Sequence, residues 1–147
     1  MSEEVQDVAR PWLPAPEGRL LGRGHPAGDF LQAHDWRVLE HSAGRYRIEA
    51  HLPAHVKNPR GHLFGGFTPT YVDLVALRTA HSILTPPLRG VATVNMRVDY
   101  FDPVLDERFL LESHVVHTRG RIHLVEVLFR ALDDKLLVHS LTTLRQR

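Results

Sequence analysis

A segment from Phe67 to Leu84 is apolar on nearly every side when it is drawn as a helix, and this constrains the fold most. Its apolar residues cover most of the helix circumference: Phe67, Tyr71, Leu74 and Val75 on one face, and Val72, Ala76, Leu77 and Ala80 on most of the rest. A helix that is apolar almost all round has to be buried. Pro69 falls in the first turn, where proline is tolerated, and Thr85-Pro86-Pro87 is predicted to end the helix. Other elements must therefore surround this segment.

The segments on both sides of the helix have the patterns of β-strands. Residues 36–42 and 45–52 are predicted strands joined by a turn at Ala43-Gly44. After the helix, apolar and polar residues alternate from Thr93 to Tyr100, which predicts a strand with Val94 and Met96 on the same face. Turn signals then separate three further strands, predicted at 108–118, 121–132 and 135–144.

This order of elements predicts an α+β fold. Strands joined by short turns are mostly antiparallel, and the sheet of about six strands has to wrap the helix because the helix is apolar on most sides. That is the hotdog arrangement, with one long central helix inside a curved antiparallel sheet. The open edge of such a sheet invites pairing with a second copy, so we expect a homo-oligomer, either a dimer or a tetramer.

The chain is predicted to have two parts. Residues 1–35 are rich in proline and glycine and are expected to form an N-terminal arm, irregular from Pro11 to Pro26, on the surface or on a partner subunit. A short helix is expected within this arm at 28–34. Residues 36–147 are the predicted hotdog domain.

Composition excludes several classes of function. A net charge of +1 gives no strong field for binding nucleic acid or a membrane surface. The absence of cysteine excludes disulfides, thiolate metal sites and a cysteine nucleophile. His51 and His55 flank Pro53 and do not share a helix face, so we expect no metal site. No apolar run has the length of a membrane helix, no secretory signal is evident, and a cytoplasmic location is expected.

The loop from Asn58 to Gly66 ends where the predicted helix begins. Glycine lets the backbone approach a ligand closely, and the first N–H groups of a helix have no internal acceptor and lie at the positive end of its dipole. A carbonyl oxygen placed against Gly65-Gly66 would find an oxyanion hole, worth about 3–4 kcal/mol per donor in the transition state. Asn58 can offer a side-chain N–H to the same oxygen. Taken alone, Gly-Gly is more typical of a plain helix entry.

Asp73 is a carboxylate inside an otherwise apolar helix. Burying a charge costs free energy unless it is paired or hydrogen-bonded, and Arg78 has the wrong helical spacing to pair with it. Asp73 therefore faces a polar pocket, meets a group from elsewhere, or lies on a wet stripe of the helix. In a pocket it can deprotonate a water or attack a substrate directly. Thr93 can hold the attacking water against Asp73, but a threonine is also simply a good strand former.

Over about residues 36–146 the chain resembles the PaaI-like and related acyl-CoA thioesterases of the hotdog superfamily, through the pattern Asn58-x2-Gly61-x2-Phe64-Gly65-Gly66-x6-Asp73 followed by Thr93. The resemblance implies hydrolysis of an acyl-CoA thioester. It implies that Asn58, Gly65 and Gly66 polarise the thioester carbonyl, and that Asp73 and Thr93 serve the water or nucleophile. The family assembles its site across a dimer interface, which implies that Thr93 serves the Asp73 of the other subunit.

Phe64 departs from the family pattern, because many PaaI-like members have His-Gly-Gly where this chain has Phe-Gly-Gly. The change removes a polar group from the thioester pocket, where Phe64 is expected to contact substrate. The phosphates of coenzyme A need cations, and guanidinium groups bind phosphate bidentately. The candidates are Arg89, Arg97, Arg119 and Arg121, although each is equally consistent with a solvated strand end. Coenzyme A would enter as part of the substrate, and no cofactor is expected.

Two other functions fit the same fold. The first is a non-catalytic module that binds acyl-CoA or an acyl carrier, which Phe64 favours. The second is a dehydratase or hydratase, and such hotdog enzymes resemble one another in pairing a carboxylate with a histidine. The sequence places no suitable histidine beside Asp73: Arg78 is five residues further on, and His81 lies near the helix end. We therefore rank the hydratase below the thioesterase.

Overall fold

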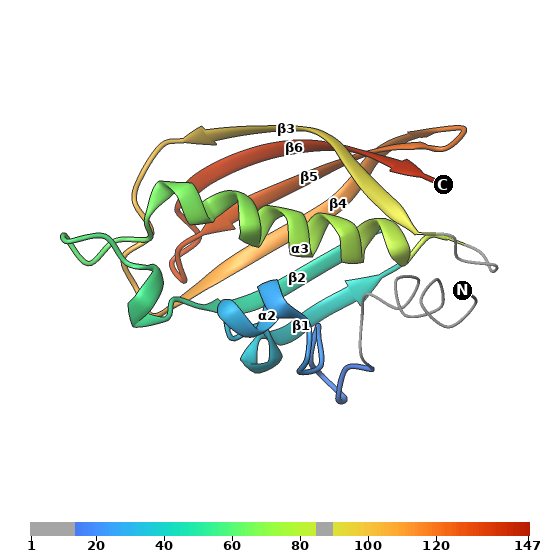
Figure 1. Cartoon of the computed structure of the whole chain (residues 1–147). Coiled ribbons are helices and arrows are strands. Elements are labelled where there is room, and N and C mark those ends of the chain that lie inside the picture. Colours follow the sequence, from blue (N-terminus) through green and yellow to red (C-terminus); the bar gives the residue numbers. More distant parts are fainter. Residues whose placement is uncertain (1–13, 85–89) are drawn as a thin grey trace.

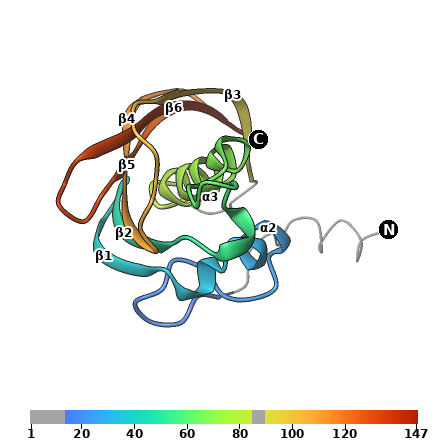
Figure 2. The same cartoon turned by 90° about the vertical axis from the view of Figure 1, so that its left-hand side faces the viewer.

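In the computed structural model, which describes residues 14–84 and 90–147, an antiparallel sheet curves around one long helix (Figures 1 and 2). The sheet has six strands in the order β1-β2-β4-β5-β6-β3. Their bounds are β1 Arg37–Ser42, β2 Arg45–His51, β3 Val91–Tyr100, β4 Arg108–Arg119, β5 Ile122–Arg130 and β6 Leu136–Gln146. The central helix is α3, Thr68–His81. The predicted hotdog fold is confirmed.

The helix α3 forms where the periodicity predicts it, and it ends slightly earlier. Pro69 lies at its start, and a 3₁₀ turn, η3 (Gly65–Phe67), leads into it. The chain leaves the helix at Ser82, whose N–H still bonds to the Arg78 and Thr79 carbonyls. The predicted stop at Thr85-Pro86-Pro87 lies outside the described residues.

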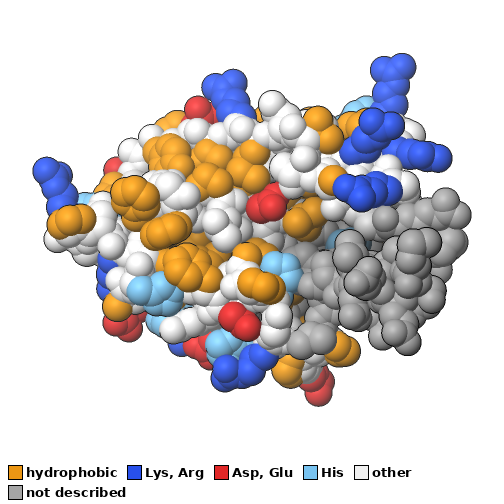
Figure 3. Space-filling model, in the orientation of Figure 1, with side chains coloured by type: hydrophobic (Ala, Val, Ile, Leu, Met, Phe, Trp, Pro, Cys, Tyr) orange, Lys and Arg blue, Asp and Glu red, His pale blue; other side chains and the backbone are white. Residues whose placement is uncertain are grey.

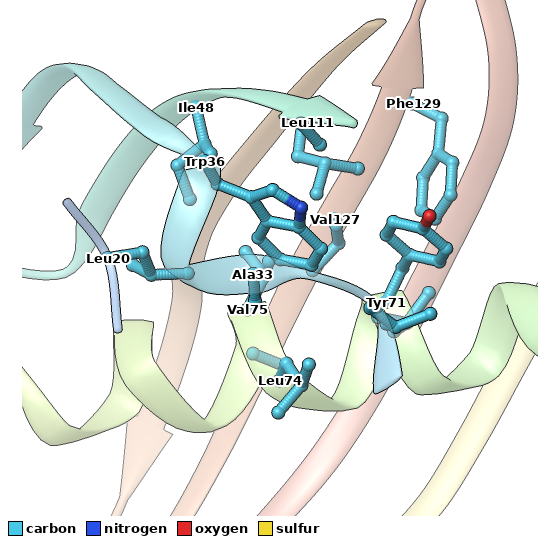
Figure 4. Close-up of a cluster of buried hydrophobic side chains, with 14 of the residues drawn as sticks. Leu20, Ala33, Trp36, Ile48, Tyr71, Leu74, Val75, Leu111, Val127 and Phe129 are labelled. Carbon is cyan, nitrogen blue, oxygen red and sulfur yellow. The ribbon is translucent and has the colours of Figure 1, made fainter. Parts of the chain in front are cut away.

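The core lies between α3 and the concave face of the sheet, and it is built around aromatic rings (Figure 4). Trp36 and Tyr71 are both fully buried, and their rings stack 5.2 Å apart. Phe109 and Phe129 pack edge-on against Tyr71 at 5.4 and 6.0 Å. The Tyr71 hydroxyl donates to the His51 carbonyl at 2.7 Å, so its polar end is satisfied on β2.

The N-terminal segment is more ordered than the predicted surface arm. Four residues of this segment are buried in the same core as the sheet and α3: Leu20, Leu21, Leu31 and Ala33. Packing these apolar side chains into the core removes them from water, which stabilises the folded chain. The expected short helix at 28–34 is instead two pieces, α2 (Pro26–Phe30) and the 3₁₀ helix η1 (Ala33–Asp35). A second 3₁₀ turn, η2 (Ala54–Val56), follows β2.

The strand β3 departs from simple alternation at one residue. Its pairing with β6 shifts register between Thr93 and Asn95, which leaves Val94 as the extra residue of a β-bulge. The prediction that Val94 shares a face with Met96 is therefore wrong, since Val94 is 59% exposed. Thr93, although exposed, faces α3 instead and pairs with the buried Leu144 of β6.

Candidate active site

The Asp73 carboxylate and the Thr93 hydroxyl meet within one chain. Thr93 Oγ1 donates a hydrogen bond to Asp73 Oδ1, joining β3 to the middle of α3. The bulge at Val94 makes this contact because it turns Thr93 toward the helix. The expectation that Thr93 would serve Asp73 of another subunit is therefore corrected: the pair is formed inside a single chain.

An open pocket of about 410 Å³ surrounds this pair. Its lining combines polar groups, His25, Thr70, Asp73 and Thr93, with the apolar residues Ala27, Pro69, Leu74, Leu77 and Met96. The pocket lies on the side of α3 that the sheet does not cover, where hydrophobic side chains gather with isolated acidic and histidine side chains among them (Figure 3). Asp73 is only half-buried there, so solvent offsets part of the cost of its charge.

Gly65 and Gly66 lie in the η3 turn ahead of α3. Among the described residues, neither backbone N–H donates a hydrogen bond, while the Gly65 carbonyl accepts one from the Tyr100 hydroxyl at 2.6 Å. The ring of Phe64 lies over Gly66, and a Cβ at that position would come within 2.7 Å of it. The turn thus presents two amide donors, and Phe64, 51% exposed, covers part of it.

Asn58 organises the loop that precedes this turn. Its side-chain oxygen accepts from the backbone N–H groups of Arg60 and His62, at 3.0 and 3.1 Å. Its carbonyl accepts from Gly61 N–H at 2.9 Å. These bonds fix the orientation of the amide and hold the loop. Asn58, Phe64, Gly65 and Gly66 do not line the Asp73 pocket.

The glycine turn and Asp73 of one chain are well separated along α3. Gly66 and Asp73 are seven residues apart, which corresponds to about 10 Å along a helix axis. An oxyanion donor and a carboxylate that attacks directly each lie within about 3 Å of the same carbonyl group, so they lie within about 6 Å of each other. A carboxylate that acts through one water can lie about 3 Å further away. The separation along the helix therefore disfavours direct attack by Asp73 on a carbonyl group bound at the glycine turn of the same chain.

The arginines predicted to bind phosphate do not line this pocket, as far as they are described. Arg97 is exposed and its Nε lies 3.0 Å from Asp99 Oδ2 on the same strand. Arg119 and Arg121 flank the exposed β4–β5 hairpin, near where β3 begins and β6 ends (Figure 1). Arg89 lies outside the described residues.

His25 is a pocket residue that the sequence analysis missed. It caps α2, and its Nδ1 accepts from Gly28 N–H at 3.1 Å. The sequence signal for this was a side-chain acceptor immediately before Pro26, typical of a helix start. Nothing in the local pattern connects that cap to Asp73, because the connection depends on how α2 packs against α3.

Burial lowers the pKa of His25, His51 and His81 below the ordinary value of 6.5, although Asp29 partly opposes this at His25. The folded state therefore holds these rings neutral, while the unfolded chain takes up protons as the pH falls through 6.5. The contribution of these neutral rings to the free energy of unfolding is fully present above pH 6.5 and is lost as the pH falls below it. We expect the urea unfolding midpoint to fall steadily from about pH 7.5 to about pH 5. A midpoint that is constant over this range would contradict the prediction.

None of the helices in the described part of the chain has the length and apolar character needed to cross a bilayer.

The chain resembles known thioesterases in sequence and in fold. A family model described as "Thioesterase superfamily" matches residues 60–138. A thioesterase family protein from Silicibacter pomeroyi superposes with a TM-score of 0.72 and 21% identity, covering 82% of this chain and 88% of that one. A hypothetical thioesterase from Streptococcus pneumoniae, solved with coenzyme A, gives 0.69 and 15% identity, with coverage of 77% and 86%.

The PaaI protein of the E. coli phenylacetic acid degradation operon gives a TM-score of 0.68 at 11% identity, covering 82% of this chain and 88% of that one. No curated protein matches the chain in a sequence search. The match to the family model spans more than half of the 147 residues. This chain therefore belongs to the thioesterase superfamily.

Proposed function

We propose that this protein hydrolyses an acyl-CoA thioester to a free acid and coenzyme A. The observation that carries the proposal is the Thr93–Asp73 hydrogen bond inside an open, partly apolar pocket. Thr93 fixes the orientation of the carboxylate, and the apolar lining suits an acyl group. The family match and a relative solved with coenzyme A support the substrate class.

The chemistry needs a base or nucleophile and an oxyanion site. In one version, Asp73 takes a proton from a water that attacks the thioester carbonyl carbon. In the other, the carboxylate attacks that carbon and water hydrolyses the resulting anhydride. In both, the carbonyl oxygen becomes negative, and the Gly65 and Gly66 N–H groups are the donors proposed to stabilise it. The C–S bond breaks when this oxyanion collapses, which gives the free acid in the first version and, in the second, the anhydride that water then hydrolyses. The coenzyme A thiolate leaves in that step and takes up a proton.

The oxyanion donors are proposed to come from a second copy of the chain. The distance along α3 keeps Gly65 and Gly66 away from Asp73 of the same chain. The Asp73 pocket is open where the sheet does not cover α3, and β3 is an edge strand with an unpaired side. A homodimer that covers this face would bring the glycine turn of one copy to Asp73 of the other.

Mixing two inactive variants tests the shared site. Asp73→Asn removes the carboxylate, and Gly65→Pro removes one amide donor at a position whose Cβ meets only ordinary contacts. If each site uses Asp73 of one copy and Gly65 of the other, random mixed dimers regain about a quarter of the wild-type activity. Thiol release measured after unfolding and refolding the two variants together is the readout. A mixture as inactive as its parts would place both groups in one chain.

His25 gives the hydratase reading an observation in its favour, since the structure places a histidine in the pocket of the Asp73 carboxylate. This corrects the expectation that no histidine is suitably placed. An assay for addition of water to an enoyl-CoA separates this function from hydrolysis. The reaction is monitored by the loss of absorbance of the conjugated double bond of the enoyl-CoA. We rank hydrolysis first because the Thr93–Asp73 pair orients the carboxylate without any contribution from the ring.

A further inference from the structure

Thr70 lines the same pocket as Asp73 and lies three residues before it on α3. Residues three apart on a helix are neighbours on its surface, with Cβ atoms about 5–6 Å apart. Helical side chains lean toward the N-terminus of the helix, so the Asp73 carboxylate is directed over the turn that carries Thr70. No hydrogen bond joins these two described side chains directly. A polar pair at this spacing suits one water molecule between its members.

The Thr70 hydroxyl is open to solvent. Within the described part of the chain it makes no hydrogen bond, and it is not among the polar atoms that are buried without a partner, such as Thr142 Oγ1. Thr79 on the same helix behaves differently, because its hydroxyl donates to the Val75 carbonyl four residues back at 2.7 Å. The hydroxyl of Thr70 is therefore able to donate to or accept from a molecule in the pocket.

Asp73 keeps one carboxylate oxygen for the same molecule. Thr93 donates to Asp73 Oδ1, while Oδ2 has no hydrogen bond or ion pair to any described residue. Four of the described residues that line the pocket are polar, and the Nδ1 atom of one of them, His25, accepts from Gly28 N–H. Thr70 is thus the described pocket hydroxyl that is not already used within the protein.

We infer that Thr70 positions the water that attacks the thioester. The inference rests on the proposed function and selects its first version, in which Asp73 is a base, because a carboxylate that has become an anhydride cannot hold this water. The water donates one hydrogen bond to Asp73 Oδ2 and the other to Thr70 Oγ1. A lone pair of the water oxygen is thereby directed at the carbonyl carbon.

The protons of this water then have separate fates. As the C–O bond forms, the proton on the Asp73 side passes to Oδ2, and the proton on the Thr70 side stays with the product as the hydroxyl of the free acid. The electrons of the C–S bond leave with the coenzyme A thiolate. The thiolate takes the proton from Asp73, which restores the carboxylate for the next turnover.

The test removes the hydroxyl and keeps the shape of the side chain. Thr70→Val replaces the hydroxyl with a methyl group on the same β-branched frame, whereas Thr70→Ser keeps the hydroxyl. We expect Thr70→Val to lower kcat for hexanoyl-CoA about 5- to 30-fold with KM unchanged, because the lost hydrogen bond serves the attack and not substrate binding. Thr70→Ser should stay within about threefold of wild type. Thr143→Val, which changes a half-buried hydroxyl of β6 outside the pocket, is the matched control.

Binding of an unreactive thioether analogue of hexanoyl-CoA, measured by calorimetry, should be the same for Thr70→Val and wild type. Weaker binding in proportion to the loss of kcat would place the hydroxyl against the substrate and overturn the inference. Unchanged kcat in Thr70→Val, or an equal loss in Thr70→Ser, would overturn it as well. A wild-type protein that hydrolyses no acyl-CoA of any chain length would instead overturn the proposed function, and with it this role for Thr70.

Discussion

Replacing Asp73 with asparagine is expected to reduce acyl-CoA hydrolysis by about 10²- to 10⁴-fold, the usual contribution of a positioned acid–base group. Asparagine has nearly the same shape and can still accept the Thr93 hydrogen bond, so the pocket should persist. What it cannot do is take a proton from water or attack a carbonyl carbon. The measurement is thiol release from a panel of acyl-CoAs that covers short, long and aromatic acyl groups.

Two controls give the result its meaning. Asp133→Asn changes a carboxylate in the turn before β6, where asparagine can still accept from Lys135 N–H, and should leave activity unchanged. Binding of an unreactive thioether analogue of hexanoyl-CoA to the Asp73→Asn variant should stay within about threefold of wild type, because the lost group acts in the transition state. Undiminished hydrolysis in Asp73→Asn would remove Asp73 from the mechanism. Wild-type binding with no turnover across the panel would favour the non-catalytic module.

Truncating Trp36 to alanine should cost about 3–5 kcal/mol in the free energy of unfolding, the range for a large buried aromatic residue. The indole is fully buried and stacks on Tyr71 of α3. It also lies where the N-terminal segment enters β1, among Leu20, Ala33 and Ile48 (Figure 4). Its loss therefore leaves a cavity at the junction of three parts of the fold. Urea unfolding followed by far-UV circular dichroism measures the change.

Trp36→Phe is the matched variant. Among the described residues, the buried Trp36 Nε1 has no hydrogen-bond partner, so phenylalanine removes an unsatisfied donor while keeping most of the ring. We expect a much smaller loss than for alanine. A loss below about 1 kcal/mol for Trp36→Ala would show that this part of the core collapses to fill the space.

The sequence predicts the architecture well because periodicity reports burial directly. The apolar residues of α3 recur on nearly every face, and a helix of that kind needs a sheet around it. Alternation likewise predicts β2, where Tyr46, Ile48 and Ala50 are buried. These patterns are local, so they can be read without knowing what the segment contacts.

The features that were missed depend on contacts between distant segments. The bulge at Val94 follows from the pairing of β3 with β6, and strict alternation gives no sign of it. The packing of Leu20 and Leu31 into the core, behind a run of prolines and glycines, is hidden for the same reason. His25 reaches the Asp73 pocket only because α2 packs on α3. The pairing of Asp73 with Thr93 was predicted by resemblance, but its location within one chain was not.

The bulge in β3 has a consequence for how this protein can change over evolution. Thr93 on one side of the bulge holds Asp73, and Tyr100 further along the strand holds the carbonyl of Gly65. Because side chains alternate, losing one paired residue between Asn95 and Tyr100 would rotate Thr93 to the outer face while Tyr100 kept its place, whereas the unpaired Val94 can be lost without changing the register. Single-residue deletions between Asn95 and Tyr100 would therefore uncouple the carboxylate from its hydroxyl without unfolding the sheet. The number of paired residues between Thr93 and Tyr100 is therefore constrained by the hydrogen bonds that these two side chains make.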